Sequence, residues 1–324
     1  MKRIRMLLAV LLSAALLSGC AGQGSGESAS ASVSQDTEAE QAVSFTDIMG
    51  YSVTLNSWDR VVSLYGSFGE TWMLAGGTLV GTTSDAIEER GLMLGDEVAI
   101  VGSVKQPNFE EILAANPDFV ILSADTAEHV ELHDALTDAG IAHAYYRVDT
   151  FSDYLSMLEQ FCSLTGRDDL YEQNGLEVQA QIQQVLEQVE GREGPTVLLL
   201  RAYSTGAKAK GADNLAGVML EDLGAENLVE RYDSLLEEVS MEEVIAADPD
   251  YIFVVTMGSS QEKALEYMSE HFQSNPAWAG LTAVANDHYV VLPKELFHYK
   301  PNARWGESYA YLAEILYPDL AGTL

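Results

Sequence analysis

Residues 109–122 read Phe-Glu-Glu-Ile-Leu-Ala-Ala-Asn-Pro-Asp-Phe-Val-Ile-Leu, and residues 241–254 read Met-Glu-Glu-Val-Ile-Ala-Ala-Asp-Pro-Asp-Tyr-Ile-Phe-Val. The two stretches share Glu-Glu, Ala-Ala and Pro-Asp in one register, and most other columns exchange one apolar residue for another. A pattern that occurs once in each half predicts two lobes of like construction rather than a solenoid, which needs at least three short repeats. Two lobes leave a cleft between them, and small ligands bind in such clefts.

Each copy of the repeat predicts a capped helix followed by a buried strand. Asn108 and Ser240 stand at the N-cap, and Glu111 and Glu243 follow three residues later, which is the spacing of a capping box. The proline of each copy disfavours helical geometry in the residue before it and predicts the end of the helix. Both glutamates are therefore expected to have structural roles.

Glu110 and Glu242 are the matched acids that this capping scheme leaves free. We expect both side chains to point outward. Acids in the first turn of a helix also suit the helix dipole, so a purely local role stays open at this point.

The N-terminus carries the pattern of an export signal. Basic residues precede a twelve-residue apolar run, Met6–Leu17, which is too short to span a membrane and is typical of a secretory signal. The run ends in Leu-Ser-Gly-Cys at residues 17–20, which resembles a bacterial lipobox. We therefore predict a lipoprotein signal peptide over residues 1–19 and acyl chains such as palmitate on Cys20, anchoring the protein to the outer side of the cell membrane.

The rest of the chain predicts an α/β protein, because short apolar strands alternate with helical patterns. A hairpin is expected over residues 44–55, and the strands that follow are expected at 61–64, 79–81, 119–122, 143–146, 197–200, 251–255 and 289–292. The predicted organisation is the lipidated Cys20 with a disordered tether over 20–42, an N-terminal lobe over 43–166, one long interlobe helix over 167–191 and a C-terminal lobe over 192–324.

The net charge excludes a nucleic-acid binder, and the cysteine content excludes a disulfide within the lobes. The formal net charge is −33, and a nucleic-acid binder needs a basic footprint that this chain lacks. Cys162 is the only cysteine besides Cys20, so no intrachain disulfide is available to the lobes. Its place in an apolar helical stripe predicts a buried, inert thiol.

The few basic residues of the lobes are unevenly spread. They gather in two groups, Arg201, Lys208 and Lys210 in one, and Lys294, Lys300 and Arg304 in the other. In so acidic a chain the clusters favour a local positive potential that faces an anionic ligand, with chance surface clustering as the alternative.

The ligand-binding candidates follow the carboxyl ends of the predicted strands, where α/β sheets bind ligands. Aromatic faces with a few guanidinium groups suit a bulky, planar or chelated anion, although some of the aromatic residues are expected to fill the lobe cores. The candidates are Tyr65, Ser67, Phe68, Tyr146 and Arg147 in the first half, and Arg201, Tyr203, Lys208, His298, Arg304 and Trp305 in the second.

Arg304 is the strongest of these candidates. Asn302 is expected to cap a helix, which places Arg304 in its positively polarised first turn. A salt bridge from Arg304 to Glu307 or Glu295 is the structural alternative. Trp305 offers a stacking face or packs into the lobe.

The sequence carries no catalytic signature. The run Gly66-Ser67-Phe68-Gly69 has the wrong spacing for a G-x-S-x-G nucleophile elbow, and there is no His-Glu-x-x-His, Walker A or Gly-x-Gly-x-x-Gly motif. His129 and His133 could share a metal with Glu128 or Glu131, but a solvated helix face is the favoured interpretation. We expect no enzymatic activity, no cofactor and no metal site.

The chain resembles the class III, helical-backbone substrate-binding proteins of ABC importers, which serve ferric siderophores, haem and cobalamin. The resemblance spans about residues 43–320 and rests on the order of several motifs: Phe45-Thr46-Asp47 with Gly50 and Val53-Thr54-Leu55, Arg60-Val61-Val62-Ser63-Leu64, the repeat described above, the single interlobe helix, and Pro301-Asn302-Ala303-Arg304-Trp305-Gly306-Glu307.

This resemblance implies two Rossmann-like lobes with the ligand cleft between them. It also implies that Glu110 and Glu242 dock into arginines of the permease, and that the partners are that permease, the cytoplasmic ATPase behind it, the membrane and an iron complex. We expect a monomer that delivers a ferric siderophore or haem. A corrinoid cargo is the alternative, and a signalling or adhesive surface lipoprotein is the alternative of another class.

Overall fold

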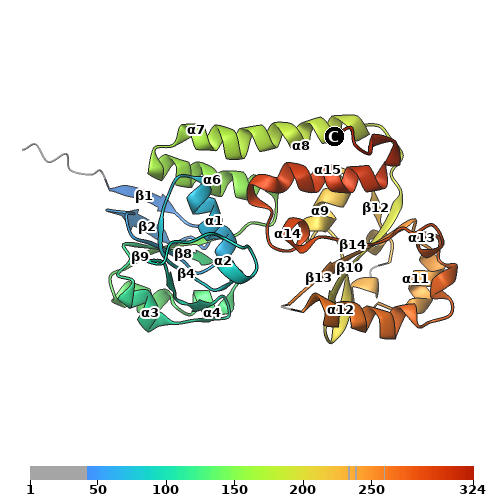
Figure 1. The fold of residues 1–324 in the computed structure, drawn as a ribbon, viewed down its shortest axis with the longest axis horizontal. Coiled ribbons are helices and arrows are strands. Elements are labelled where there is room, and N and C mark those ends of the chain that lie inside the picture. The colour runs from blue at the N-terminus through green and yellow to red at the C-terminus, as the bar shows by residue number, and fades with distance from the viewer. Residues whose placement is uncertain (1–41, 233, 238, 259) are drawn as a thin grey trace, which may run out of the picture. The chain divides into compact units, whose positions relative to one another are not determined.

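The computed structural model describes residues 42–232, 234–237, 239–258 and 260–324. The predicted signal peptide, Cys20 and the tether up to residue 41 lie outside the described residues. Within the described part, two sheets flanked by helices follow one another along the chain (Figure 1). The expected α/β fold of two lobes is confirmed.

The N-terminal lobe is built on a parallel sheet with the strand order β5-β4-β3-β8-β9. Its strands are β3 (Val61–Ser63), β4 (Leu79–Thr82), β5 (Ala99–Ile100), β8 (Phe119–Ser123) and β9 (Ala142–Tyr146). Its helices are α1 (Gly66–Leu74), α2 (Asp85–Glu88), α3 (Phe109–Ala114), α4 (Ala127–Val130), α5 (His133–Asp138) and α6 (Phe151–Thr165). A two-stranded ribbon, β6 (Gly102–Ser103) with β7 (Gln106–Pro107), joins β5 to α3.

The predicted hairpin forms from β1 (Val43–Thr46) and β2 (Ser52–Leu55). Asp47 holds its turn, because its Oδ1 accepts hydrogen bonds from the backbone N–H groups of Met49 and Tyr51. Its other carboxylate oxygen accepts from the N–H of Tyr145 at 3.0 Å and thereby fastens the hairpin to β9.

One helical stretch connects the lobes, as α7 (Asp168–Tyr171), a π-helical segment (Glu172–Leu176) and α8 (Glu177–Val189). The sequence predicts a regular helix here, and the wide π turn is the difference. Within it the carbonyl of Asn174 accepts a hydrogen bond from the Tyr154 hydroxyl at 2.8 Å, and the Asn174 amide donates to the carbonyl of Leu74 at 2.9 Å. The helix widens where it is hydrogen-bonded to the N-terminal lobe, since the π turn frees a backbone carbonyl.

The C-terminal lobe has the strand order β11-β10-β13-β14, with β12 also paired to β10, and only β11 is antiparallel to its neighbour. Its strands are β10 (Thr196–Tyr203), β11 (Gly206–Lys210), β12 (Glu226–Asn227), β13 (Tyr251–Thr256) and β14 (Tyr289–Val291). Its helices are α9 (Leu215–Asp222), α10 (Ser234–Glu237), α11 (Met241–Ala247), α12 (Gln261–Met268), α13 (Thr282–Ala285), α14 (Lys294–Phe297) and α15 (Trp305–Leu316).

The repeat forms equivalent structures in both lobes, α3 with β8 and α11 with β13. Asn116 and Asp248, the residues before the two prolines, have φ values of 46° and 42°. Each helix thus ends through a left-handed residue, a conformation that Asn and Asp tolerate. Asp118 and Asp250 follow the prolines. Each carboxylate accepts from a backbone N–H at the start of the first strand of the lobe's main sheet, that of Arg60 just before β3 and that of Thr196 in β10.

The capping prediction is only half correct. Asn108 Oδ1 accepts from the N–H groups of Glu110 and Glu111, so it caps α3. The reciprocal bond from a glutamate side chain is missing, because the Asn108 N–H donates to the carbonyl of Val101. Ser240 makes no side-chain cap at all.

The position of Glu243 explains why no capping box forms at Ser240. Its carboxylate accepts a hydrogen bond from the Ser234 hydroxyl at 2.5 Å, so it supports α10 instead of capping α11.

A continuous apolar core connects the lobes. It includes Phe119 under the first sheet, Phe161 of α6, Val178 and Val185 of α8, and Leu312 of α15. The two helices α8 and α15 pack together above the C-terminal sheet (Figure 1). A second cluster covers the other face of each sheet. The interlobe helix is thus part of the core of both lobes.

Candidate functional site

Tyr65 and Asp85 lie together at the carboxyl ends of β3 and β4. The Asp85 carboxylate accepts from the N–H of Gly66 at 2.8 Å, and a Cβ atom at Gly66 would meet the backbone of Ala86 at 2.7 Å, so only glycine allows this close approach. Burial, with the charges of Asp85 and Glu89, raises the pKa of Tyr65 to about 12. Tyr65 is therefore a neutral phenol at physiological pH and can donate a hydrogen bond.

The charges of several cations act on His298 in the C-terminal lobe. Burial, together with the charges of Lys294, Arg201 and Lys300, lowers the pKa of His298 to about 4. The imidazole stays neutral at pH 7, because its protonation would add a further positive charge to a partly desolvated group of cations. We call Arg201, Lys294, His298 and Lys300 the cation cluster.

The cation cluster faces the N-terminal lobe. Burial lowers the pKa of Lys294, and the charge of Glu89, the residue after α2, opposes this effect. Lys294 also donates to the carbonyl of Gly258 at 2.5 Å and lies 5.3 Å from the centre of the Tyr299 ring. The end of α2 therefore lies within electrostatic reach of α14.

Arg90 connects the lobes directly. Its guanidinium donates to the carbonyl of Tyr299 and, at 3.1 Å, to that of Lys300, and it forms an ion pair with Glu70 of α1. Burial lowers the pKa of Arg90 to about 10, so the group still carries its charge at pH 7.

The segment between α14 and α15 receives further support from the N-terminal lobe. Asn302 Nδ2 donates to the carbonyl of Ser67 at 2.9 Å and to Glu70 Oε2 at 2.7 Å, and Lys300 Nζ donates to the carbonyl of Val148. Lys300 and Asn302 both have a φ of 52°, which is uncommon outside glycine. Asn302 does not cap the following helix as predicted, because its side chain is used between the lobes.

Several sequence candidates fall within or beside the cation cluster. Arg201 pairs in register with Lys208 across β10 and β11. Tyr203 ends β10, and its ring lies against Gly206. With Tyr65 and His298, these residues keep their predicted role as ligand-binding candidates.

Two predicted ligand arginines are instead paired within their own lobe. Arg304 is exposed and forms a bidentate ion pair with Glu307 at 2.7 and 2.8 Å, which is the structural alternative. Arg147 forms an ion pair with Asp125 at 2.6 Å. A ligand would have to displace these carboxylates.

Four other candidates belong to the core. Trp305 is fully buried with its ring 6.0 Å from that of Phe151, and Phe68 and Tyr146 are buried in the same core. The stacking face expected of Trp305 is therefore not exposed, because α15 turns this residue toward α6. Ser67 is also buried, and it takes part only through its backbone carbonyl.

The two histidines of the predicted helix face do not share one solvated surface. His129 is fully buried; its Nδ1 accepts from the N–H of Ser123 at 3.1 Å and its Nε2 lies 3.0 Å from the carbonyl of Val104. His133 begins a separate helix, where it contacts His143 at 2.9 Å. The prediction of one solvated helix was wrong because the chain turns between α4 and α5.

Glu110 and Glu242 occupy matched exposed positions on α3 and α11. Neither carboxylate forms a hydrogen bond or ion pair with any residue that the structure describes. Their outward orientation agrees with the prediction, and their role stays a proposal.

The sequence missed the residues that join the lobes. Glu70, Glu89 and Arg90 come from segments without a recognisable motif, and Asn302 was expected only as a helix cap. Arg90 could have been noticed as a lone base in an acidic run, Glu88-Glu89-Arg90. Its partner Tyr299 lies 209 residues away, and no local pattern indicates that contact.

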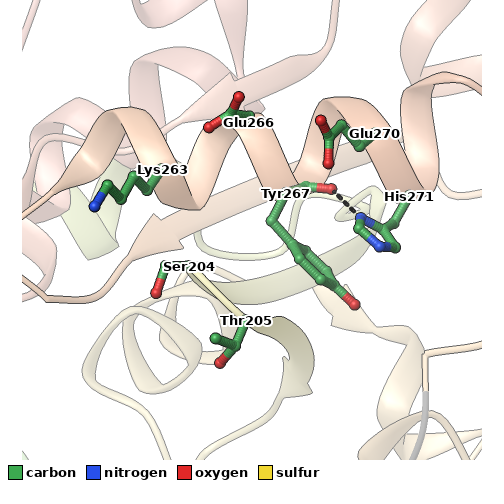
Figure 2. Close-up of a pocket in the computed structure, with 7 residues that line it drawn as sticks. All are labelled: Ser204, Thr205, Lys263, Glu266, Tyr267, Glu270 and His271. Carbon is green, nitrogen blue, oxygen red and sulfur yellow. Dashed lines mark hydrogen bonds between the residues drawn. The ribbon is translucent and has the colours of Figure 1, made fainter.

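A groove of about 470 Å³ lies outside this site, on the C-terminal lobe (Figure 2). The turn after β10, one side of α12 and the π-helical segment Ser269–Gln273 line it, through Ser204, Thr205, Lys263, Glu266, Tyr267, Glu270 and His271. Figure 2 shows the Tyr267 and His271 rings close together. The rings are stacked, with their centres 4.0 Å apart. None of the ligand-binding candidates lines this groove.

Two further observations concern metals and membranes. Among the described residues no three His, Cys, Asp or Glu side chains gather in a way that could hold a metal ion. In the same part of the chain, no helix has the length and apolar character needed to cross a bilayer.

Comparison with known proteins gives a consistent result. The chain is 24% identical to the Fe(3+)-citrate-binding protein YfmC of Bacillus subtilis, over 88% of this chain and 87% of that protein. It is 23% identical to the petrobactin-binding protein YclQ of the same organism, over 90% of this chain and 91% of that protein. Staphylococcus aureus SirA complexed with staphyloferrin B shares the fold, with a TM-score of 0.64, 21% identity, and coverage of 86% of this chain and 98% of that one.

The family comparison covers most of both lobes. A model described as "Periplasmic binding protein" matches residues 61–296, from the first strand of the N-terminal sheet to α14. Proteins of this kind carry a substrate and do not transform it. The two lobes, the interlobe helix and this match together show that the chain belongs to the periplasmic binding protein family.

Proposed function

We propose that this protein is the substrate-binding component of an ABC importer and that it captures an anionic ferric complex of the siderophore or citrate class. The observation that carries the proposal is the cation cluster around a neutral His298, in which Arg201 and Lys294 form no ion pair with any described residue and Lys300 pairs with Asp149 at a long 3.4 Å. A chain with a net charge of −33 concentrates positive charge at the carboxyl ends of its strands, where α/β sheets bind ligands.

The chemistry of the cluster fits such a cargo. Carboxylate and catecholate chelators leave negative charge on the oxygens around Fe(3+), and charge-assisted bonds to Lys and Arg are the strong hydrogen bonds of proteins. Tyr65 and neutral His298 add uncharged donors. The relatives named for Fe(3+)-citrate and petrobactin support the same class of ligand.

Haem and cobalamin are the alternative cargoes. Tyr203 and His298 are the accessible residues that could reach haem iron, whereas Tyr146 is buried. Cobalamin carries one phosphodiester and haem carries negative charge only on its two propionates, whereas a carboxylate or catecholate chelate carries it on the oxygens around the iron, so we favour the ferric chelate.

The same proposal includes membrane attachment and delivery. Cys20 carries the lipid anchor on the outer side of the membrane. The monomer docks on the permease through Glu110 and Glu242, and the permease is in turn coupled to the cytoplasmic ATPase. The lipobox-like run at residues 17–20 supports the anchor, and the matched exposure of the two glutamates supports docking.

Transport by living cells tests the proposal. A strain that lacks the gene receives 55Fe as ferric citrate or ferric petrobactin, and in parallel haem or labelled cobalamin. We expect the loss of uptake of one ferric chelate, restored by the wild-type gene. Loss confined to haem or cobalamin assigns the alternative cargo. Unchanged uptake of all four refutes an importer role and favours a signalling or adhesive lipoprotein.

A further inference from the structure

The repeat places an exposed aliphatic residue at the same position in each lobe. Leu113 of α3 and Ile245 of α11 are aligned in the two copies, and their side chains are 42% and 40% exposed. Exposed leucines and isoleucines are ordinary one by one. An aligned pair of them is not ordinary, because a large apolar side chain is exposed at the same helical position in both lobes.

Each of these residues lies beside one of the unpaired glutamates. Leu113 follows Glu110 by three residues, and Ile245 follows Glu242 by three, so each pair shares one helix face. Ile112 of α3 and the equivalent Val244 of α11 are buried and hold the opposite face of each helix against its lobe. Each helix therefore presents a carboxylate and an aliphatic group side by side to solvent.

We infer that Leu113 and Ile245 are apolar anchors of the surface that docks on the permease, which rests on the docking role proposed above for Glu110 and Glu242. The partner is the outward face of the permease, with two equivalent subsites that each hold a cation beside an apolar pocket. The aliphatic group excludes water from the ion pair, and the attraction between two charges is stronger where water is excluded.

Charge complementarity favours this occupant over a second copy of the chain. A self-association through these helices would bring like carboxylates together in a protein of net charge −33, and like charges at an interface are unfavourable. A partner with a cation beside an apolar pocket at each subsite would bind both the carboxylate and the aliphatic group of each pair.

The test measures docking of ligand-free protein on the purified permease–ATPase complex in lipid nanodiscs by biolayer interferometry. The variants are Leu113→Asn, Ile245→Asn and the double variant, with Glu110→Ala/Glu242→Ala for comparison. Leu176→Asn is the matched control, because Leu176 is also 42% exposed but lies on the interlobe helix outside the repeat. Conservative Leu113→Met and Ile245→Met variants show whether an apolar group is enough.

We expect each Asn variant to weaken docking about tenfold, the effects to multiply in the double variant, and both Met variants and Leu176→Asn to dock like wild type. Melting temperatures check that every variant is folded. If the glutamate variant loses docking while the Asn variants retain it, the apolar anchors are refuted and the proposed docking stands. If wild type itself does not dock, the proposed docking role fails and the anchors fail with it.

Discussion

Arg90 of the N-terminal lobe donates a hydrogen bond to the backbone carbonyl of Tyr299 in the C-terminal lobe. Only backbone is needed on the receiving side, so the contact depends on the path of the chain between α14 and α15. The same guanidinium pairs with Glu70, which also accepts from Asn302. Arg90 therefore connects the segment between α14 and α15 to α1 of the N-terminal lobe.

Arg90→Ala is expected to destabilise the protein, because it removes the cation that pairs with Glu70, which keeps only its bond from Asn302, and the donor to two backbone carbonyls. The expected loss is about 1–3 kcal/mol of unfolding free energy. Urea unfolding followed by circular dichroism measures it. The control is Arg192→Ala, whose pair with Asp319 is more exposed and should contribute less than about 1 kcal/mol. Equal losses in both variants would show that Arg90 has no special role between the lobes.

The elements that the sequence predicted correctly are those with a strong local cause. The strands at 119–123 and 251–256 are short apolar runs behind a helix-ending Asn-Pro or Asp-Pro. The strands β5, β6 and β7 were missed because they have two residues each and carry no period. Pattern also failed at Ser240, where tertiary contacts decided which group Glu243 would bind.

The site was only partly predictable for a similar reason. The uneven spread of Lys294 and Lys300 is visible in the sequence. The direction of a side chain at the start of a helix is not, because a residue such as Trp305 can turn toward the cleft or toward the core with the same local pattern. The contact of Arg90 with Tyr299 depends on how the lobes meet.

Stability is expected to fall as the pH drops from about 6.5 to about 4. Burial lowers the pKa of His129 to about 4, and that of His298 by a similar amount. Between the folded and unfolded pKa values the unfolded chain binds more protons, so acid favours unfolding. Each such group costs up to about 1.4 kcal/mol per pH unit in this window. Thermal melts from pH 7 to 4.5 measure the decline.

His129→Gln separates this effect from general acid denaturation. The variant is expected to be less stable at pH 7, because it cannot replace both hydrogen bonds of the buried ring, yet its melting temperature should depend less on pH. His271→Gln, at an exposed position, should keep the wild-type slope. An unchanged slope in the His129 variant would refute the role of this histidine.

Ligand binding is expected to move the lobes only slightly. The apolar core continues through α8 and α15, and Arg90, Lys300 and Asn302 already hold the lobes together. Small-angle X-ray scattering with and without ferric citrate should show nearly the same radius of gyration. A change of several ångströms would contradict the continuous core as the element that limits motion.

Cys162 is expected to be chemically inert in the folded protein. The thiol is buried, and burial raises its pKa to about 11, so little thiolate forms at neutral pH. In a soluble Cys20→Ala variant, a disulfide reagent should react with Cys162 only after unfolding in urea. Rapid reaction of the native protein would show that the cover over the thiol opens readily.

Direct titration calorimetry with Fe(3+)-citrate and ferric petrobactin tests the central claim, binding of an anionic ferric chelate by the cation cluster. Wild type is compared with Arg201→Ala, Lys294→Ala and the control Arg231→Ala, whose cation pairs with Glu226 on the surface. We expect one chelate to bind, with about tenfold to a hundredfold loss in each cluster variant and no loss in the control. Binding that is equal in all four proteins, or absent for both chelates while haem or cobalamin binds, would contradict the account.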